Sequence, residues 1–117
     1  MKIEKFEDII AWQKAKILTT NIYSTFKDSK DFSFRDQIQR ASVSIMNNIA
    51  EGFERKGDRE LGKFLFIAKG SCGEVRSMLY LAFELNYLTK EKTRELYDLS
   101  LEIFRLLSGL IKTLNFN

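Results

Sequence analysis

Hydrophobic residues recur at intervals of three and four over long stretches of the 117-residue chain, which is the periodicity of amphipathic α-helices. The clearest stretch, residues 61–85, holds two adjacent heptad series. The first series is Leu61, Leu65, Ala68, Cys72, Val75, Leu79 and Ala82, and the second series is Phe64, Ile67, Ser71, Glu74, Met78, Leu81 and Leu85. One series is enough for a helix that faces a core on one side. Two series predict either a helix deep in the protein or a second apolar surface covered by another subunit.

Four helical segments are separated by short stretches rich in Gly, Asn, Asp and Ser. Their predicted bounds are about Glu7 to Lys27, an N-cap at Ser33 to about Arg55, a cap at Asp58 to about residues 84–86, and a cap at Thr89 to about Leu114. Gly57 is expected to cap the C-terminus of the second helix. Long helices with short connections favour antiparallel neighbours. The predicted fold is therefore all-α, an up-down-up-down antiparallel four-helix bundle that forms one domain over residues 1–117.

Apolar residues occur on nearly every side of the first predicted helix. Ile10 and Ile17 face one direction, Leu18 faces a second and Trp12 faces a third. A single chain of this size has limited interior to bury all of them. The pattern therefore favours self-association.

Composition restricts the chemistry. The sequence has no histidine, which excludes histidine-dependent hydrolysis, histidine-containing zinc sites and the Glu-x-x-His pairs of di-iron bundles. Cys72 is the only cysteine and occupies a core heptad position, so we expect a buried thiol in a reducing compartment. No catalytic residue, metal site or cofactor is predicted. No signal peptide and no membrane-spanning run of about 18 apolar residues is recognised, so a cytoplasmic protein without membrane contact is expected.

A polar strip follows the second predicted helix. Within an arc of about 80° it contains Gln37, Arg40, Ser44, Asn48, Glu51 and Arg55. Ser and Asn are poor helix formers, so their presence suggests that the strip makes specific contacts. It is either a binding site in a groove or interface, or a network that sets packing. Glu74, in the second heptad series, needs a partner if it is buried, and Arg40 is the candidate.

Three glycines interrupt the third predicted helix, where each costs about 1 kcal/mol relative to alanine. They are Gly62, Gly70 and Gly73. Close approach of two helices around residues 70–73 explains them without a ligand. A phosphate-binding loop is disfavoured, because no strand precedes the segment and no P-loop pattern is present.

Four basic residues surround the predicted turn between the second and third helices. They are Arg55, Lys56, Arg59 and Lys63, with Asp58 and Glu60 among them. The cluster is either a solvated bundle end or a contact surface for the phosphates of a nucleic acid. The whole chain, with 19 Lys and Arg against 16 Asp and Glu, has a formal charge of only +3.

Several sequence blocks together resemble one protein family. They are Trp12-Gln13-Lys14-Ala15, Gln37-Ile38-Gln39-Arg40-Ala41, Ser44-Ile45, Asn48-Ile49-Ala50-Glu51-Gly52-Phe53, Gly70-Ser71 and Glu74. The chain resembles the bacterial 23S rRNA intervening sequence proteins over nearly its whole length. The resemblance implies a four-helix bundle, a ring-like homopentamer, no established catalytic activity, and kinship with accessory proteins that bind a reverse transcriptase and its RNA. The family's recurring residues fall on Arg40, Ser44, Asn48, Glu51, Arg55, Gly70, Ser71 and Glu74.

Two functions remain open from the sequence. The first is a non-enzymatic oligomeric module that binds RNA or a ribonucleoprotein, with the basic turn as its contact and a ring multiplying the charge of each chain. The alternative is a structural or protein-interaction scaffold with no nucleic-acid role. An enzyme is least favoured, because its chemistry would rest on Glu51 or Glu74 alone.

Overall fold

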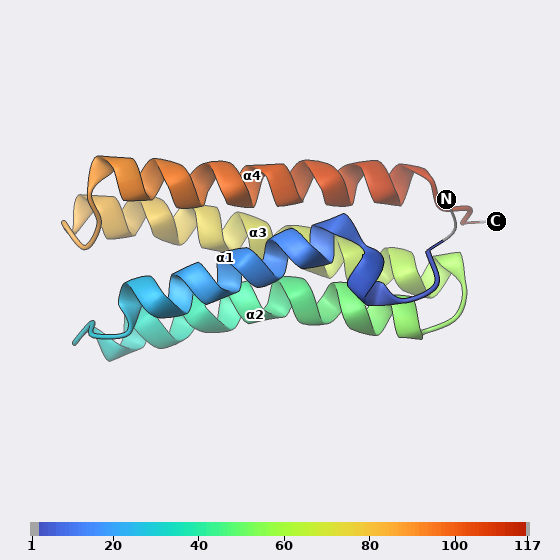
Figure 1. Ribbon diagram of the computed structural model, residues 1–117, viewed down its shortest axis with the longest axis horizontal. Helices are drawn as coiled ribbons and strands as arrows, with labels where there is room; N and C mark the ends of the chain where they lie inside the picture. The colour runs from blue at the N-terminus through green and yellow to red at the C-terminus, as the bar shows by residue number, and fades with distance from the viewer. Residues whose placement is uncertain (1–2, 117) are drawn as a thin grey trace.

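The computed structural model describes residues 3–116 and contains four long helices. They are α1 (Ile10–Phe26), α2 (Phe32–Glu54), α3 (Asp58–Glu84) and α4 (Lys90–Lys112), preceded by a short 3-10 helix, η1 (Phe6–Asp8). The helices lie side by side along a molecule of 46 × 22 × 22 Å, and each runs opposite to the one before it (Figure 1). The predicted all-α helical bundle is confirmed.

The helix ends agree with the sequence at one cap and differ at the others. The side chain of Thr89 accepts a hydrogen bond from the backbone N–H of Lys92 at 3.1 Å, so Thr89 caps α4 as predicted. The N-cap of α2 is Asp31 and not Ser33, because the Asp31 carboxylate accepts from the backbone N–H of Phe34. An acidic side chain in that position also interacts favourably with the helix dipole.

The α2–α3 turn differs from the sequence prediction in its capping residues. The C-cap of α2 is Arg55, so the expected cap at Gly57 is wrong. Gly57 is instead the residue before α3 and has a φ of +111°, a conformation that side chains disfavour. Asp58 is therefore the first residue of α3 and not its cap.

The core is built from one face of each helix. Its fully buried side chains include Leu18 and Ile22 of α1, Ile45 and Ile49 of α2, the first heptad series of α3 from Leu65 to Ala82, and Leu96, Ile103 and Leu107 of α4. In the second series Ser71 and Met78 are buried, whereas Ile67 and Leu81 are about half exposed. Within one chain, α3 is therefore not deeply enclosed, and part of its second series forms an exposed apolar surface.

Close helix approach occurs at Gly52 and not at the glycines of residues 70–73. A Cβ atom at Gly70 would have nothing within 4 Å, and one at Gly73 would meet only Arg76 Nη2 at 3.8 Å, so the prediction that these two glycines permit a close helix approach is wrong. A Cβ atom at Gly52 would lie 2.7 Å from the Phe64 Cβ atom. Gly62 is covered by the Phe116 ring. Helices α2 and α3 thus approach closely near their connecting turn, where Gly52 leaves space for Phe64.

The end of the bundle away from the termini is closed by a contact between two connections (Figure 1). The hydroxyl of Tyr87, between α3 and α4, donates to the second carboxylate oxygen of Asp31 at 2.6 Å. This bond holds the pKa of Asp31 below its usual value and raises the pKa of Tyr87. The Tyr87 ring also packs edge-on against Phe34. The two connections are therefore joined at the cap of α2.

Within residues 3–116, none of the helices combines the length and apolar character needed to cross a membrane.

Candidate functional site

The centre of the polar strip is a small hydrogen-bond network between α2 and α3. The Ser71 hydroxyl donates to Ser44 Oγ at 2.9 Å, and Asn48 Nδ2 donates to the oxygens of Ser44 at 2.8 and 3.0 Å. Ser71 is buried, while Ser44 and Asn48 are half-buried. The network therefore joins residues 27 positions apart, and its donors are used inside the chain.

One end of the strip differs from the expected pairing. Glu74 is exposed, and Gln37 Nε2 donates to its carboxylate at 3.2 Å. The expected Arg40–Glu74 pair is wrong, because Arg40 instead lines a shallow hollow with Tyr23 of α1 and Asp36 of α2. Glu74 needs no buried cation, since it remains in contact with water.

The other end of the strip is an ion-pair cluster at the α2–α3 turn. Arg55 Nη2 lies 2.9 Å from the Glu51 carboxylate, and its Nη1 lies 3.8 Å from Glu60. Lys63 Nζ lies 3.2 Å from the other Glu60 oxygen. The Arg55 guanidinium also covers the Phe64 ring at 5.2 Å. Two of the four basic residues proposed to contact nucleic acid are thus partly neutralised by acids of the chain.

The remaining two cations of the turn are more available. Lys56 and Arg59 are exposed and form no ion pair with any residue in the range 3–116. Lys56 precedes Gly57 in the turn, and Arg59 follows it after Asp58. A negatively charged partner would therefore meet these two side chains first.

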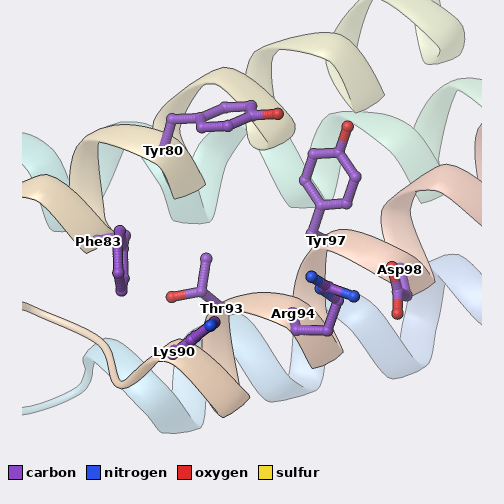
Figure 2. Close-up of a pocket in the computed structure, with 7 residues that line it drawn as sticks. All are labelled: Tyr80, Phe83, Lys90, Thr93, Arg94, Tyr97 and Asp98. Atoms are coloured by element: carbon purple, nitrogen blue, oxygen red, sulfur yellow. The ribbon is translucent and has the colours of Figure 1, made fainter.

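A further pocket lies between the C-terminal part of α3 and the first turns of α4. It is a hollow of about 380 Å³ lined by Tyr80, Phe83, Lys90, Thr93, Arg94, Tyr97 and Asp98. Figure 2 shows Tyr97 rising from α4 toward Tyr80 of α3, with Phe83, Lys90 and Arg94 around the same hollow. The tyrosine rings meet edge to face at 5.7 Å, and a hydrogen bond with Tyr97 raises the pKa of Tyr80. The pocket combines aromatic rings with two cations.

No heptad series contains Tyr80 or Phe83, which is why the core pattern did not reveal this pocket. A usable signal was present in the spacing of Lys90 and Arg94, since residues four apart share one face of a helix. Only the packing of α3 on α4 places that face beside Tyr80. Across the part of the chain that the structure describes, no group of three or more His, Cys, Asp or Glu residues is arranged to hold a metal ion.

Comparison with known proteins identifies the family. A family model described as 23S rRNA-intervening sequence protein matches residues 7–109. The chain belongs to this family. A crystal structure of a protein of unknown function from the S23 ribosomal protein family of Bacteroides thetaiotaomicron is similar to this member, with 28% identity, a TM-score of 0.82, and coverage of 88% of this chain and 99% of that chain. No curated protein matches it.

The family match confirms the resemblance drawn from the Trp-Gln-Lys-Ala and Asn-Ile-Ala-Glu-Gly blocks. Both comparisons cover most of this 23S rRNA-intervening sequence protein, and the residues matched by the family model include the polar strip and the α2–α3 turn. The function of the Bacteroides thetaiotaomicron protein is unknown. The similarity therefore shows that the two proteins share a fold, and it identifies no activity.

Proposed function

We propose that this family member is a non-enzymatic, self-associating module that binds RNA or a ribonucleoprotein. The observation that carries the self-association is the amount of large apolar surface left open on two helices. Ile10 and Ile17 of α1 are 57% and 51% exposed, and Ile67 and Leu81 of α3 are 51% and 48% exposed. Clusters of such side chains on a soluble surface are typical of protein interfaces.

The two apolar surfaces lie on different sides of the molecule. Helices α1 and α3 do not pack against each other and stand diagonally across the bundle. A closed ring requires two different surfaces per subunit, one for each neighbour. The arrangement supports a homopentamer, the ring that the family resemblance implies, better than it supports a two-fold dimer.

The RNA component is supported by the exposed cations of the α2–α3 turn. Lys56 and Arg59 project from the end of each bundle without an acidic partner among the described residues. In a pentamer the formal charge of +3 per chain would become about +15, and the turn would be repeated five-fold. A repeated basic surface attracts phosphate backbones strongly at low ionic strength.

The test combines light scattering with RNA titration. We expect a mass of about five times the 13.7 kDa chain, and RNA binding that weakens steeply with salt. The double variant Lys56→Glu, Arg59→Glu should bind RNA more weakly than the control Lys16→Glu, Lys27→Glu, which makes the same charge change at exposed positions of α1 and its end. A monomeric mass would refute self-association, and absence of RNA binding at low salt would refute the RNA role.

A scaffold without a nucleic-acid role is the second candidate. It is favoured by the neutralisation of Arg55 and Lys63 by Glu51 and Glu60, which halves the free charge of the turn. Purification from native lysate distinguishes the two functions. A stoichiometric protein partner without enriched RNA would support the scaffold.

A further inference from the structure

One face of the bundle, formed by α3 and α4, carries aromatic rings and cations in alternation, and we call it the α3–α4 face. Its aromatic residues are Phe66, Tyr80, Phe83, Tyr97 and Phe104. Its cations are Lys69, Arg76, Lys90 and Arg94. The pocket between Tyr80 and Arg94 forms one end of this face.

Contacts between neighbours make the face continuous. Lys69 Nζ lies 5.7 Å from the centre of the Phe66 ring and 4.8 Å from that of Phe104. The Arg76 guanidinium lies 4.8 Å from the same Phe104 ring, and its charge also acts on Tyr80. Tyr80 meets Tyr97, which lines the pocket with Lys90 and Arg94. From residue 66 to residue 83 the face follows α3 for about 25 Å.

The cations of this face are not neutralised by the chain. None of the four forms an ion pair with any residue from 3 to 116, whereas at the α2–α3 turn two of four cations do. Asp98 is the one acid among the seven residues that line the pocket. The face therefore presents four cations without an ion pair among the described residues, against two at the basic turn.

Arg76 carries a donor that the described part of the chain leaves unpaired. Its Nη1 atom is buried, and no hydrogen-bond acceptor for it exists among the described residues. Buried guanidinium donors are normally satisfied, because leaving one unpaired is costly. Because Nη1 is buried and the guanidinium lies against Phe104, a phosphate oxygen would pair with this atom only after the Arg76 side chain turns outward.

The aromatic rings are open to a planar ligand. Tyr80 is 64% exposed, Phe66 is 54% exposed and Phe83 is 42% exposed. Open rings beside unpaired cations are typical of surfaces that bind single-stranded nucleic acids, where bases stack on rings and phosphates meet Lys and Arg. A duplex offers its phosphates to the cations but keeps its base faces stacked inside the helix.

We propose that the α3–α4 face binds single-stranded RNA, with bases stacked on Tyr80, Phe83 and Phe66 and phosphates held by the neighbouring cations. This inference rests on the proposed RNA function and places the strand on a surface other than the α2–α3 turn. The turn then serves to attract RNA at a distance, while the face holds the strand.

The test measures binding of a fluorescently labelled oligouridine of roughly a dozen nucleotides to the full-length chain. The variant Tyr80→Ala, Phe83→Ala should bind about 10-fold or more weakly, because stacking on exposed rings is lost. The control Tyr23→Ala, which removes a ring that is 45% exposed on α1, should bind as the wild type does. Both changes are at exposed side chains, and circular dichroism verifies that the variants are folded.

The outcomes separate this inference from the proposed function. If the Lys56→Glu, Arg59→Glu variant loses RNA binding and the Tyr80→Ala, Phe83→Ala variant does not, the RNA function stands and the α3–α4 face is not its site. Equal affinity for a duplex of the same length would also overturn the inference, as would full competition by uridine monophosphate alone. An acidic protein partner recovered on this face in place of RNA would overturn both the strand-binding inference and the proposed RNA function. Weakened strand binding by the Tyr80→Ala, Phe83→Ala variant, with the Tyr23→Ala control unchanged, would support the inference.

Discussion

Cys72 shows how a residue's position alone can decide its chemistry. Its thiol is fully buried in the core of α3, and this burial raises its pKa to about 12, against a smaller opposing effect of the Arg76 charge. A thiol at neutral pH is then protonated and out of reach of reagents. The core position expected from the first heptad series therefore also accounts for the absence of a nucleophile at this site.

The Cys72 pKa predicts a loss of stability in alkali. The unfolded chain ionises the thiol near its ordinary pKa of 9.0, whereas the folded chain keeps it neutral until about 12. The neutral thiol therefore does not reduce the free energy of unfolding below pH 9. Between pH 9 and about 12 that free energy falls by about 1.4 kcal/mol per pH unit. Urea unfolding of wild type and Cys72→Ala measures this, because the variant lacks that decline. Parallel pH profiles for the two proteins would contradict the assignment.

At the scale of the element, the crossing of α2 and α3 depends on one glycine that the sequence pattern did not single out. Gly52 permits contact with Phe64 and Leu61, while Gly70 faces open space. Both residues weaken a helix by nearly the same intrinsic amount. The two glycines differ only in their surroundings, because side chains of α3 lie against Gly52 and no side chain of residues 3–116 lies against Gly70.

Substitution of each glycine by alanine should therefore have opposite effects on stability. Gly52→Ala forces a Cβ atom against the Phe64 side chain and should lower the free energy of unfolding by about 1–3 kcal/mol. Gly70→Ala gains helix propensity without a clash and should raise it by up to about 1 kcal/mol. Denaturant unfolding at low protein concentration gives both values. A destabilised Gly70→Ala protein would mean that another copy of the chain approaches that position closely.

At the scale of the whole molecule, the bundle leaves two apolar surfaces uncovered on diagonal helices. One includes Ile10 and Ile17 on α1, and the other includes Ile67 and Leu81 on α3. In a ring, the α1 surface of one subunit would meet the α3 surface of the next. Every contact in such a ring would therefore need an α1 surface on one subunit and an α3 surface on its neighbour.

We expect each surface to be necessary for assembly. Both Ile10→Ser, Ile17→Ser and Ile67→Ser, Leu81→Ser should be monomers in light scattering, because each variant keeps only one of the two surfaces. A mixture of the two variants should form a one-to-one dimer, in which the intact α1 surface of one meets the intact α3 surface of the other. Failure of the mixture to associate would contradict a head-to-tail ring and favour contact between identical surfaces.

The sequence by itself determined the four helices, the first heptad series of the core, the Thr89 cap and the family. These features are local or repeat along the chain, since helical periodicity and capping depend on residues three or four positions apart. The components of the polar strip were likewise found by their spacing. Their hydrogen bonds were not, because Ser71 belongs to another helix.

Only the tertiary structure decided which side chains meet across helices. It placed Gln37 and not Arg40 against Glu74, seated Phe64 on Gly52, and brought Tyr80 to Tyr97 at the edge of a pocket. These contacts depend on how far two helices are rotated and shifted against each other, which is set by the packing of all their side chains together. The α3–α4 face exists for the same reason, because its rings and cations come from segments that are separate in sequence and adjacent only in the folded bundle.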